Sequence, residues 1–110
     1  MDNLSTTFYA LADPTRRAIL ARLSRGETTL SELALPFDMT VPAVAKHVRV
    51  LEEAGLVRRG LRGATRPIRL RARALRGAHE WTERYRGFWD TSLDRLGVYL
   101  ASTAERQRGR

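Results

Sequence analysis

Residues 30–57 read LSELALPFDMTVPAVAKHVRVLEEAGLV, and this stretch decides the fold of the chain. Its pattern predicts two short helices with a tight turn between them, followed directly by a strand. Thr29 begins a capping-box pattern before the first helix, and Pro36 ends that helix. Thr40 supplies the N-cap of the second helix, and Gly55 lets the chain leave it. This order of elements is typical of a helix-turn-helix, which places its second helix in the major groove of DNA.

The second of these helices, about residues 41–54, is amphipathic. At 100° per residue its apolar residues cluster on one side, which we expect to face the core: Val41, Val44, Val48 and Leu51. The N-terminal half of the other side is small, polar or basic. Hydroxyl and imidazole groups suit phosphates, the lysine suits guanine or a phosphate, and the small apolar residues suit thymine methyl groups. We therefore predict DNA contacts from Thr40, Pro42, Ala43, Lys46, His47 and Arg49.

Positive charge is concentrated in and after this helix. The whole formal net charge of +8 lies in residues 46–76, which hold ten basic residues against two glutamates. Localised charge of this size calls for a polyanion, namely DNA, RNA or an anionic membrane surface. Strand-like runs at 56–59 and 66–70 predict a hairpin, a basic wing of about residues 56–71, with DNA contacts from Arg59, Arg62 and Arg66. RNA is less favoured, because the basic segment has no aromatic stacking platform.

Helical patterns flank this centre on both sides. Two short helices are expected at about residues 4–11 and 14–25, and a long one at about 73–104, on the order of 45 Å if unbroken. Five of the eight aromatic residues lie in the long helix, and so wide an apolar face usually marks a protein interface. We expect this face and the first helix to form a homodimer interface through Leu4, Phe8, Trp81, Tyr85, Phe88, Trp89, Leu93, Leu96 and Leu100.

The composition excludes several classes of protein. A chain without cysteine has neither disulfides nor thiolate-bound metals. Because it has no run of 18 apolar residues and no secretory signal, we expect a cytoplasmic, nucleoid-associated bacterial protein with no membrane partner. His47 has no Ser or Cys nucleophile, paired carboxylate or glycine-rich phosphate loop to work with. We therefore predict no catalytic residues and no enzyme activity.

The chain resembles the ArsR-type winged-helix repressors over roughly residues 8–70. Three phrases of that family occur together here: ALADPTRRxILxxL, xELA and xxAVxxHxxVLexAGLV. The resemblance implies a homodimer joined by its first and last helices, a groove-reading helix, a wing beside the minor groove, and repression by occupying a promoter. It also implies two sets of DNA contacts, one on the reading helix and one at the wing tip: Thr40, Pro42, Ala43, Lys46 and His47, and Arg62 and Arg66.

The metal-sensing members of that family use ligands that this chain lacks. Thr29 and Ser31 stand where the arsenic and cadmium sensors carry cysteine. The zinc-type site needs paired ligands on the last helix; His79 and Glu83 supply at most half of one, and a solvated helix face is the favoured interpretation. The aromatic last helix resembles instead the branch without metal ligands, which often acts as an autorepressor. We expect no metal and no cofactor.

These observations predict one domain over residues 1–110 that is mainly α with a small β-hairpin. It is a winged helix-turn-helix of about five helices and a two-stranded wing, with the helix-turn-helix at about 29–54 and a dimerisation helix at about 73–104. The predicted function is a homodimeric repressor, and by resemblance an autorepressor, on a palindromic operator in double-stranded DNA. Two alternatives stay open: a metal- or small-ligand-responsive repressor of the same fold, and a winged-helix dimer that docks a partner protein.

Overall fold

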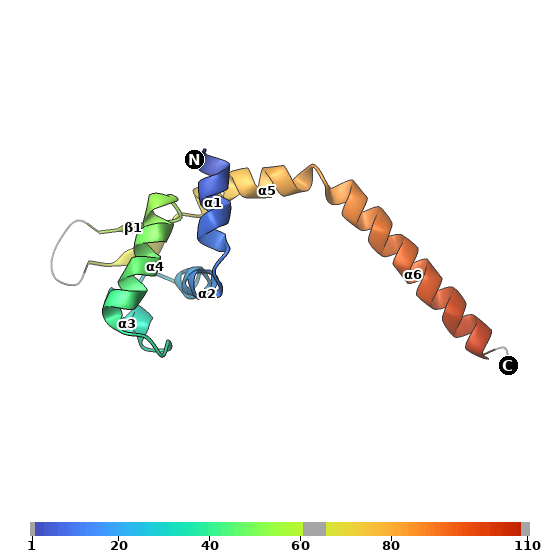
Figure 1. The fold of residues 1–110 in the computed structure, drawn as a ribbon, viewed down its shortest axis with the longest axis horizontal. Coiled ribbons are helices and arrows are strands. Elements are labelled where there is room, and N and C mark those ends of the chain that lie inside the picture. Colours follow the sequence, from blue (N-terminus) through green and yellow to red (C-terminus); the bar gives the residue numbers. More distant parts are fainter. Residues whose placement is uncertain (1, 61–65, 109–110) are drawn as a thin grey trace. The chain divides into compact units, whose positions relative to one another are not determined.

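The computed structural model describes residues 2–60 and 66–108 and divides into two compact units, Met1–Ala78 and His79–Arg110. The first unit carries the helix-turn-helix and the hairpin, and the second carries most of the C-terminal helices (Figure 1). Within the described ranges, six α-helices and one two-stranded antiparallel sheet confirm the predicted mainly helical fold with a small hairpin. No helix of those ranges is both long and apolar enough to cross a membrane.

The first unit begins with four capped helices: α1 (Asn3–Leu11), α2 (Pro14–Leu23), α3 (Leu30–Ala34) and α4 (Val41–Glu53). The residue before each helix accepts a hydrogen bond from a backbone N–H of the first turn: Asp2, Asp13, Thr29 and Thr40. Each cap satisfies an N–H group that has no partner inside its helix, and contributes about 1 kcal/mol. The predicted caps at the last three positions are confirmed.

The core of this unit is built from α1 to α4 and the hairpin. Its largest fully buried side chains are Ile19, Leu33, Val44, Val48, Leu51, Leu56 and Ile68. Each such side chain contributes roughly 1.5–3 kcal/mol by leaving water. Three of the four residues predicted for the core face of α4 are therefore confirmed. Val41 is the exception, with 41% of its surface exposed, because it is the first residue of the helix and lies at the edge of the core.

The wing is anchored on both sides of its second strand. β1 (Val57–Arg59) and β2 (Ile68–Leu70) pair antiparallel, with Val57 opposite Leu70. On its other side Ile68 bridges to Thr28, which precedes α3; the N–H of Thr28 donates to the Ile68 carbonyl at 3.1 Å, and the N–H of Ile68 donates to the Thr28 carbonyl at 2.7 Å. The base of the wing is thus fixed against the helix-turn-helix.

Only one half of the predicted capping box is seen at α3. Thr29 Oγ1 accepts from the backbone N–H of Glu32 at 3.3 Å, as expected. The Glu32 carboxylate instead accepts from Thr28 Oγ1 at 2.7 Å. Because Thr28 is buried and bridges to the wing, this bond satisfies a polar side chain at the wing base.

The prediction of one long C-terminal helix is wrong. A 3₁₀ turn, η1 (Ala72–Ala74), leads into α5 (Leu75–Glu83), and a break separates α5 from α6 (Arg86–Arg108). At the break the N–H of Tyr85 donates to the Thr82 carbonyl at 3.0 Å, and Thr82 Oγ1 donates to the His79 carbonyl at 2.9 Å. These three-residue spacings close the last turn of α5. The apolar periodicity runs on across the break, so it gave no sign of it.

Candidate nucleic-acid interface

The N-terminal half of α4 exposes the residues that the sequence pattern assigned to DNA. Thr40 Oγ1 accepts from the N–H of Ala43 at 3.3 Å and so begins the helix. Four predicted contacts are exposed and two are half-buried: Thr40, Pro42, Lys46 and Arg49, and Ala43 and His47. The opposite side of α4 is held in the core. The exposed side is therefore rigidly supported and open to a ligand.

His47 also joins α4 to the start of α2. Its Nδ1 lies 3.8 Å from Asp13 Oδ2 and 3.5 Å from Arg16 Nη1, and the side chain is 22% exposed. The backbone N–H of Arg16, followed by the charges of His47 and Arg16, holds the pKa of the Asp13 carboxyl below its usual value. The imidazole thus has a packing role within the protein. Its assignment as a phosphate contact stays a prediction.

Arg16 is the residue of this region that the sequence analysis missed. Its side chain is buried, and two of its nitrogens donate to the last carbonyls of α1: Nε to Ala10 at 2.7 Å and Nη2 to Tyr9 at 2.9 Å. The guanidinium also lies 5.3 Å from the centroid of the Tyr9 ring. The available signal was an arginine three residues after the Asp13 cap, which brings it back over the preceding helix end.

Two of the three predicted wing arginines lie at the base of the wing, and Arg62 lies outside the described residues. Arg66 is exposed, and its Nε donates to the Gly60 carbonyl at 2.6 Å, which fixes its guanidinium. Arg59 is only 21% exposed, and its Nε lies 3.7 Å from Glu52 Oε1 of α4. The two described arginines differ in accessibility, so they are not equivalent phosphate contacts.

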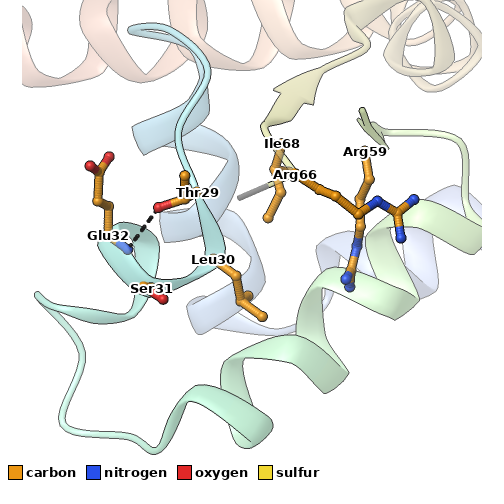
Figure 2. A pocket seen from close by; sticks show the side chains of 7 residues that line it. All are labelled: Thr29, Leu30, Ser31, Glu32, Arg59, Arg66 and Ile68. Carbon is orange, nitrogen blue, oxygen red and sulfur yellow. Dashed lines mark hydrogen bonds between the residues drawn. The ribbon is translucent and has the colours of Figure 1, made fainter. Parts of the chain in front are cut away.

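A pocket of about 400 Å³ separates α3 from the wing base. Figure 2 shows the guanidinium groups of Arg59 and Arg66 on the wing side, and Thr29, Leu30 and Ser31 on the α3 side. Residues of both elements therefore line one cavity.

Comparisons with known proteins point to one class of regulator. A family model described as a helix-turn-helix domain matches residues 11–60. The HTH-type transcriptional regulator Rv2034 of Mycobacterium tuberculosis is 48% identical over 50 residues, which are 46% of this chain and 47% of that protein, so the match spans about half of that relative. The uncharacterized HTH-type transcriptional regulator YuzN of Bacillus subtilis is 45% identical over 73 residues, 60% of this chain and 79% of that protein. The transcriptional repressor SdpR of Bacillus subtilis is 33% identical over 54 residues, 49% of this chain and 60% of that protein.

Similarity to solved structures identifies the family of this chain. The crystal structure of an ArsR family transcriptional regulator matches with 42% identity and a TM-score of 0.74, over 81% of this chain and 98% of that one. This chain belongs to the ArsR family. An ArsR-like transcriptional regulator from Rhodococcus matches with 32% identity and a TM-score of 0.67, over 86% and 89% of the two chains. A homodimeric winged helix-turn-helix DNA-binding domain from Mycobacterium bovis, at 22% identity and a TM-score of 0.63 over 76% and 81%, shares the fold.

In this ArsR protein, hydroxyl groups line the pocket at the positions where the family's metal sensors carry cysteine. Both Thr29 and Ser31 are pocket residues. Within residues 2–60 and 66–108, no group of three or more His, Cys, Asp and Glu side chains lies close enough to hold a metal ion. On α5, His79 Nε2 lies 3.8 Å from Glu83 Oε1, and Glu83 also pairs with Arg86. The expectation that the protein binds no metal stays a prediction.

The second unit of this ArsR protein exposes a large set of apolar side chains. Its exposed members include every residue predicted there for the dimer interface: Trp81, Tyr85, Phe88, Trp89, Leu93, Leu96 and Leu100. Val98 and Tyr99, which were not predicted, are exposed as well. On α1, Phe8 is exposed and Leu4 is half-buried. These side chains are accessible on a single chain, and their role in an interface stays a prediction.

Proposed function

We propose that this ArsR protein is a homodimeric repressor that binds a palindromic operator in double-stranded DNA, and that it acts on its own promoter. The observation that carries the proposal is the N-terminal half of α4. Its polar and basic side chains are exposed, while Val44, Val48 and Leu51 hold the helix in the core. The relatives support a regulatory role, and the name of SdpR supports repression.

The residues of α4 and those of the wing have different roles in DNA recognition. Thr40 and His47 bind phosphates, Lys46 and Arg49 reach guanine edges or phosphates, and the small residues Pro42 and Ala43 contact thymine methyl groups. The wing arginines Arg59, Arg62 and Arg66 neutralise phosphates and release counterions. Sequence preference therefore comes from α4, and much of the affinity comes from the wing.

Dimerisation sets the spacing of the operator. Two-fold symmetry places two copies of α4 in successive major grooves, about 10 bp apart. The exposed apolar side chains of α5 and α6 supply the surface for the second copy, together with Leu4 and Phe8 of α1. The homodimeric state of the Mycobacterium bovis domain supports this assembly.

A DNA-binding measurement on the whole chain tests the proposal. Fluorescence anisotropy at moderate salt compares the region upstream of the protein's own coding sequence with a shuffled fragment of equal length and composition. We expect a preference of at least about 10³-fold for the native fragment, the usual ratio for specific sites. Equal affinity for the two fragments would contradict specific repression.

The exposed aromatic face of α6 favours a second candidate function. A winged-helix dimer that has lost DNA reading would use Phe88, Trp89 and Tyr99 to dock a partner protein. Equal DNA affinity, together with a face that stays exposed in the dimer, supports this candidate. A face that is buried in the dimer argues against it.

A further inference from the structure

The pocket between α3 and the wing base has the chemistry of an anion site. Its wing side carries the guanidinium groups of Arg59 and Arg66, and its α3 side carries Ser31, whereas the Thr29 hydroxyl points toward the Glu32 backbone (Figure 2). Leu30 and Ile68 supply its apolar lining. The volume of about 400 Å³ falls within the range of small-molecule sites.

Arg59 has a hydrogen-bonding group without a partner. Its Nε is buried and has no hydrogen-bond partner among the described residues. The nearest carboxylate oxygen, Glu52 Oε1, is 3.7 Å away, which is too far for a hydrogen bond. The Nε edge of this guanidinium is thus closed to solvent on the Glu52 side, and Arg59 lines the pocket with the rest of its side chain.

One hydrogen bond to the backbone fixes the Arg66 side chain and uses only one of its five N–H groups. Its Nε donates to the Gly60 carbonyl at 2.6 Å, and a guanidinium has four more N–H groups in a planar fork that matches phosphate oxygens. The one carboxylate among the lining residues belongs to Glu32. It accepts from Thr28 Oγ1 at 2.7 Å and points away from the two guanidinium groups (Figure 2).

We propose that this pocket binds a phosphate group, held by the Arg59 and Arg66 guanidinium groups and the Ser31 hydroxyl. The group is either a phosphate of the DNA backbone or that of a free phosphate or small phosphorylated compound. The DNA case rests on the proposed function, whereas the free case does not. Because both cases use the same arginines, a free phosphate compound in the pocket lowers the affinity of the wing for DNA.

A titration of the full-length protein with inorganic phosphate tests the free case without DNA. The readouts are the amide signals of Ser31 and Ile68 and the arginine Nε–H signals in ¹H–¹⁵N spectra, with sodium chloride at matched ionic strength as reference. We expect saturable shifts with phosphate and not with chloride. Ser31→Ala and Arg59→Gln should each weaken binding about tenfold, whereas Arg58→Gln, which removes an exposed charge from the same strand outside the pocket, should not.

The DNA arm separates the two sources of phosphate. If phosphate binds saturably, DNA should displace it and the free case is supported. If phosphate does not bind saturably, Ser31→Ala and Arg59→Gln should still lower affinity for native and shuffled DNA by equal factors. Both losses should exceed that of Arg58→Gln. This result assigns the pocket to the DNA backbone. The proposal is overturned if phosphate does not bind saturably and if Ser31→Ala and Arg59→Gln lower DNA affinity no more than Arg58→Gln does. A wild-type protein that prefers no DNA fragment refutes the operator model, and the phosphate titration still decides the pocket. Melting temperatures of the variants show whether each one folds.

Discussion

Nη1 of Arg16 in α2 lies 3.5 Å from Nδ1 of His47 in α4, although 31 residues separate them in the chain. A guanidinium only donates, so a hydrogen bond across this contact requires Nδ1 to accept. The other nitrogens of the same guanidinium hold the last carbonyls of α1. One side chain therefore sets the helix proposed to read DNA relative to α1 and α2.

Replacing Arg16 by methionine should destabilise the protein by about 3 kcal/mol, because two carbonyls of α1, one in a buried bond and one in a part-buried bond, lose charge-assisted hydrogen bonds. Urea unfolding at neutral pH measures the change. Arg17→Met is the matched control. Arg17 is exposed and donates to the Leu11 carbonyl at 2.7 Å, so its replacement should cost less than about 1 kcal/mol. Equal losses for the two variants would show that the hydrogen bonds of Arg16 stabilise the fold no more than that of Arg17.

Asp13 should contribute to the acid sensitivity of folding. Its pKa is lower in the folded protein than in the unfolded chain, so its carboxylate stabilises the fold above about pH 4, and that contribution is lost as the pH falls through the folded pKa. Asp13→Asn keeps the N-cap and removes the titration. Unfolding free energies at pH 6 and pH 3 should therefore differ less in this variant than in the wild type. Asp38→Asn, in the turn after α3, serves as control, and a wild-type-like pH profile for Asp13→Asn contradicts the assignment.

Lys46→Ala should change which base pairs are preferred. Lys46 is exposed on the first half of α4, and the loss of one specific base contact costs about 1–3 kcal/mol at its position in the site. Anisotropy titrations with single-base variants of the operator measure the preference. Arg25→Ala removes an exposed charge just after α2 and should leave the preference unchanged. If Lys46→Ala weakened every fragment by the same factor, α4 would not be the reader.

Arg66→Ala should weaken native and shuffled DNA alike. The loss of one phosphate contact lowers the slope of log affinity against log salt by about 1. Titrations between low and moderate salt measure that slope. Arg66→Lys retains the charge and should keep the slope near the wild-type value. A loss confined to the native fragment would instead place Arg66 at a base edge.

Leu96→Asp should convert the proposed dimer into a monomer. Leu96 is exposed on α6 in a single chain, and a buried unpaired carboxylate at the centre of an apolar interface is strongly unfavourable. Sedimentation velocity measures the mass in solution. Leu35→Asp is the control, because Leu35 is 81% exposed after α3 and is not among the residues proposed for the interface. If both variants remain dimers, the α6 face does not hold the copies together.

Short-range sequence patterns predicted much of the structure of the first unit. The caps at Asp13, Thr29 and Thr40 and the core face of α4 depend on residues within one or two turns, so they could be read directly. The same reading failed for Val41, whose exposure depends on where the core ends, and for the C-terminal helix, whose break depends on hydrogen bonds around Thr82 that leave the apolar periodicity intact.

By itself the sequence determined the ArsR family, the capped helix α4, the basic hairpin and the exposed apolar face, because periodicity, caps and charge are local properties of the chain. Only the tertiary structure decided that Arg16 reaches His47, that Thr28 pairs with Ile68, and that Ser31 faces Arg59 and Arg66 across a pocket. These contacts join residues 28 to 40 positions apart, and packing of whole helices against the hairpin brings them together.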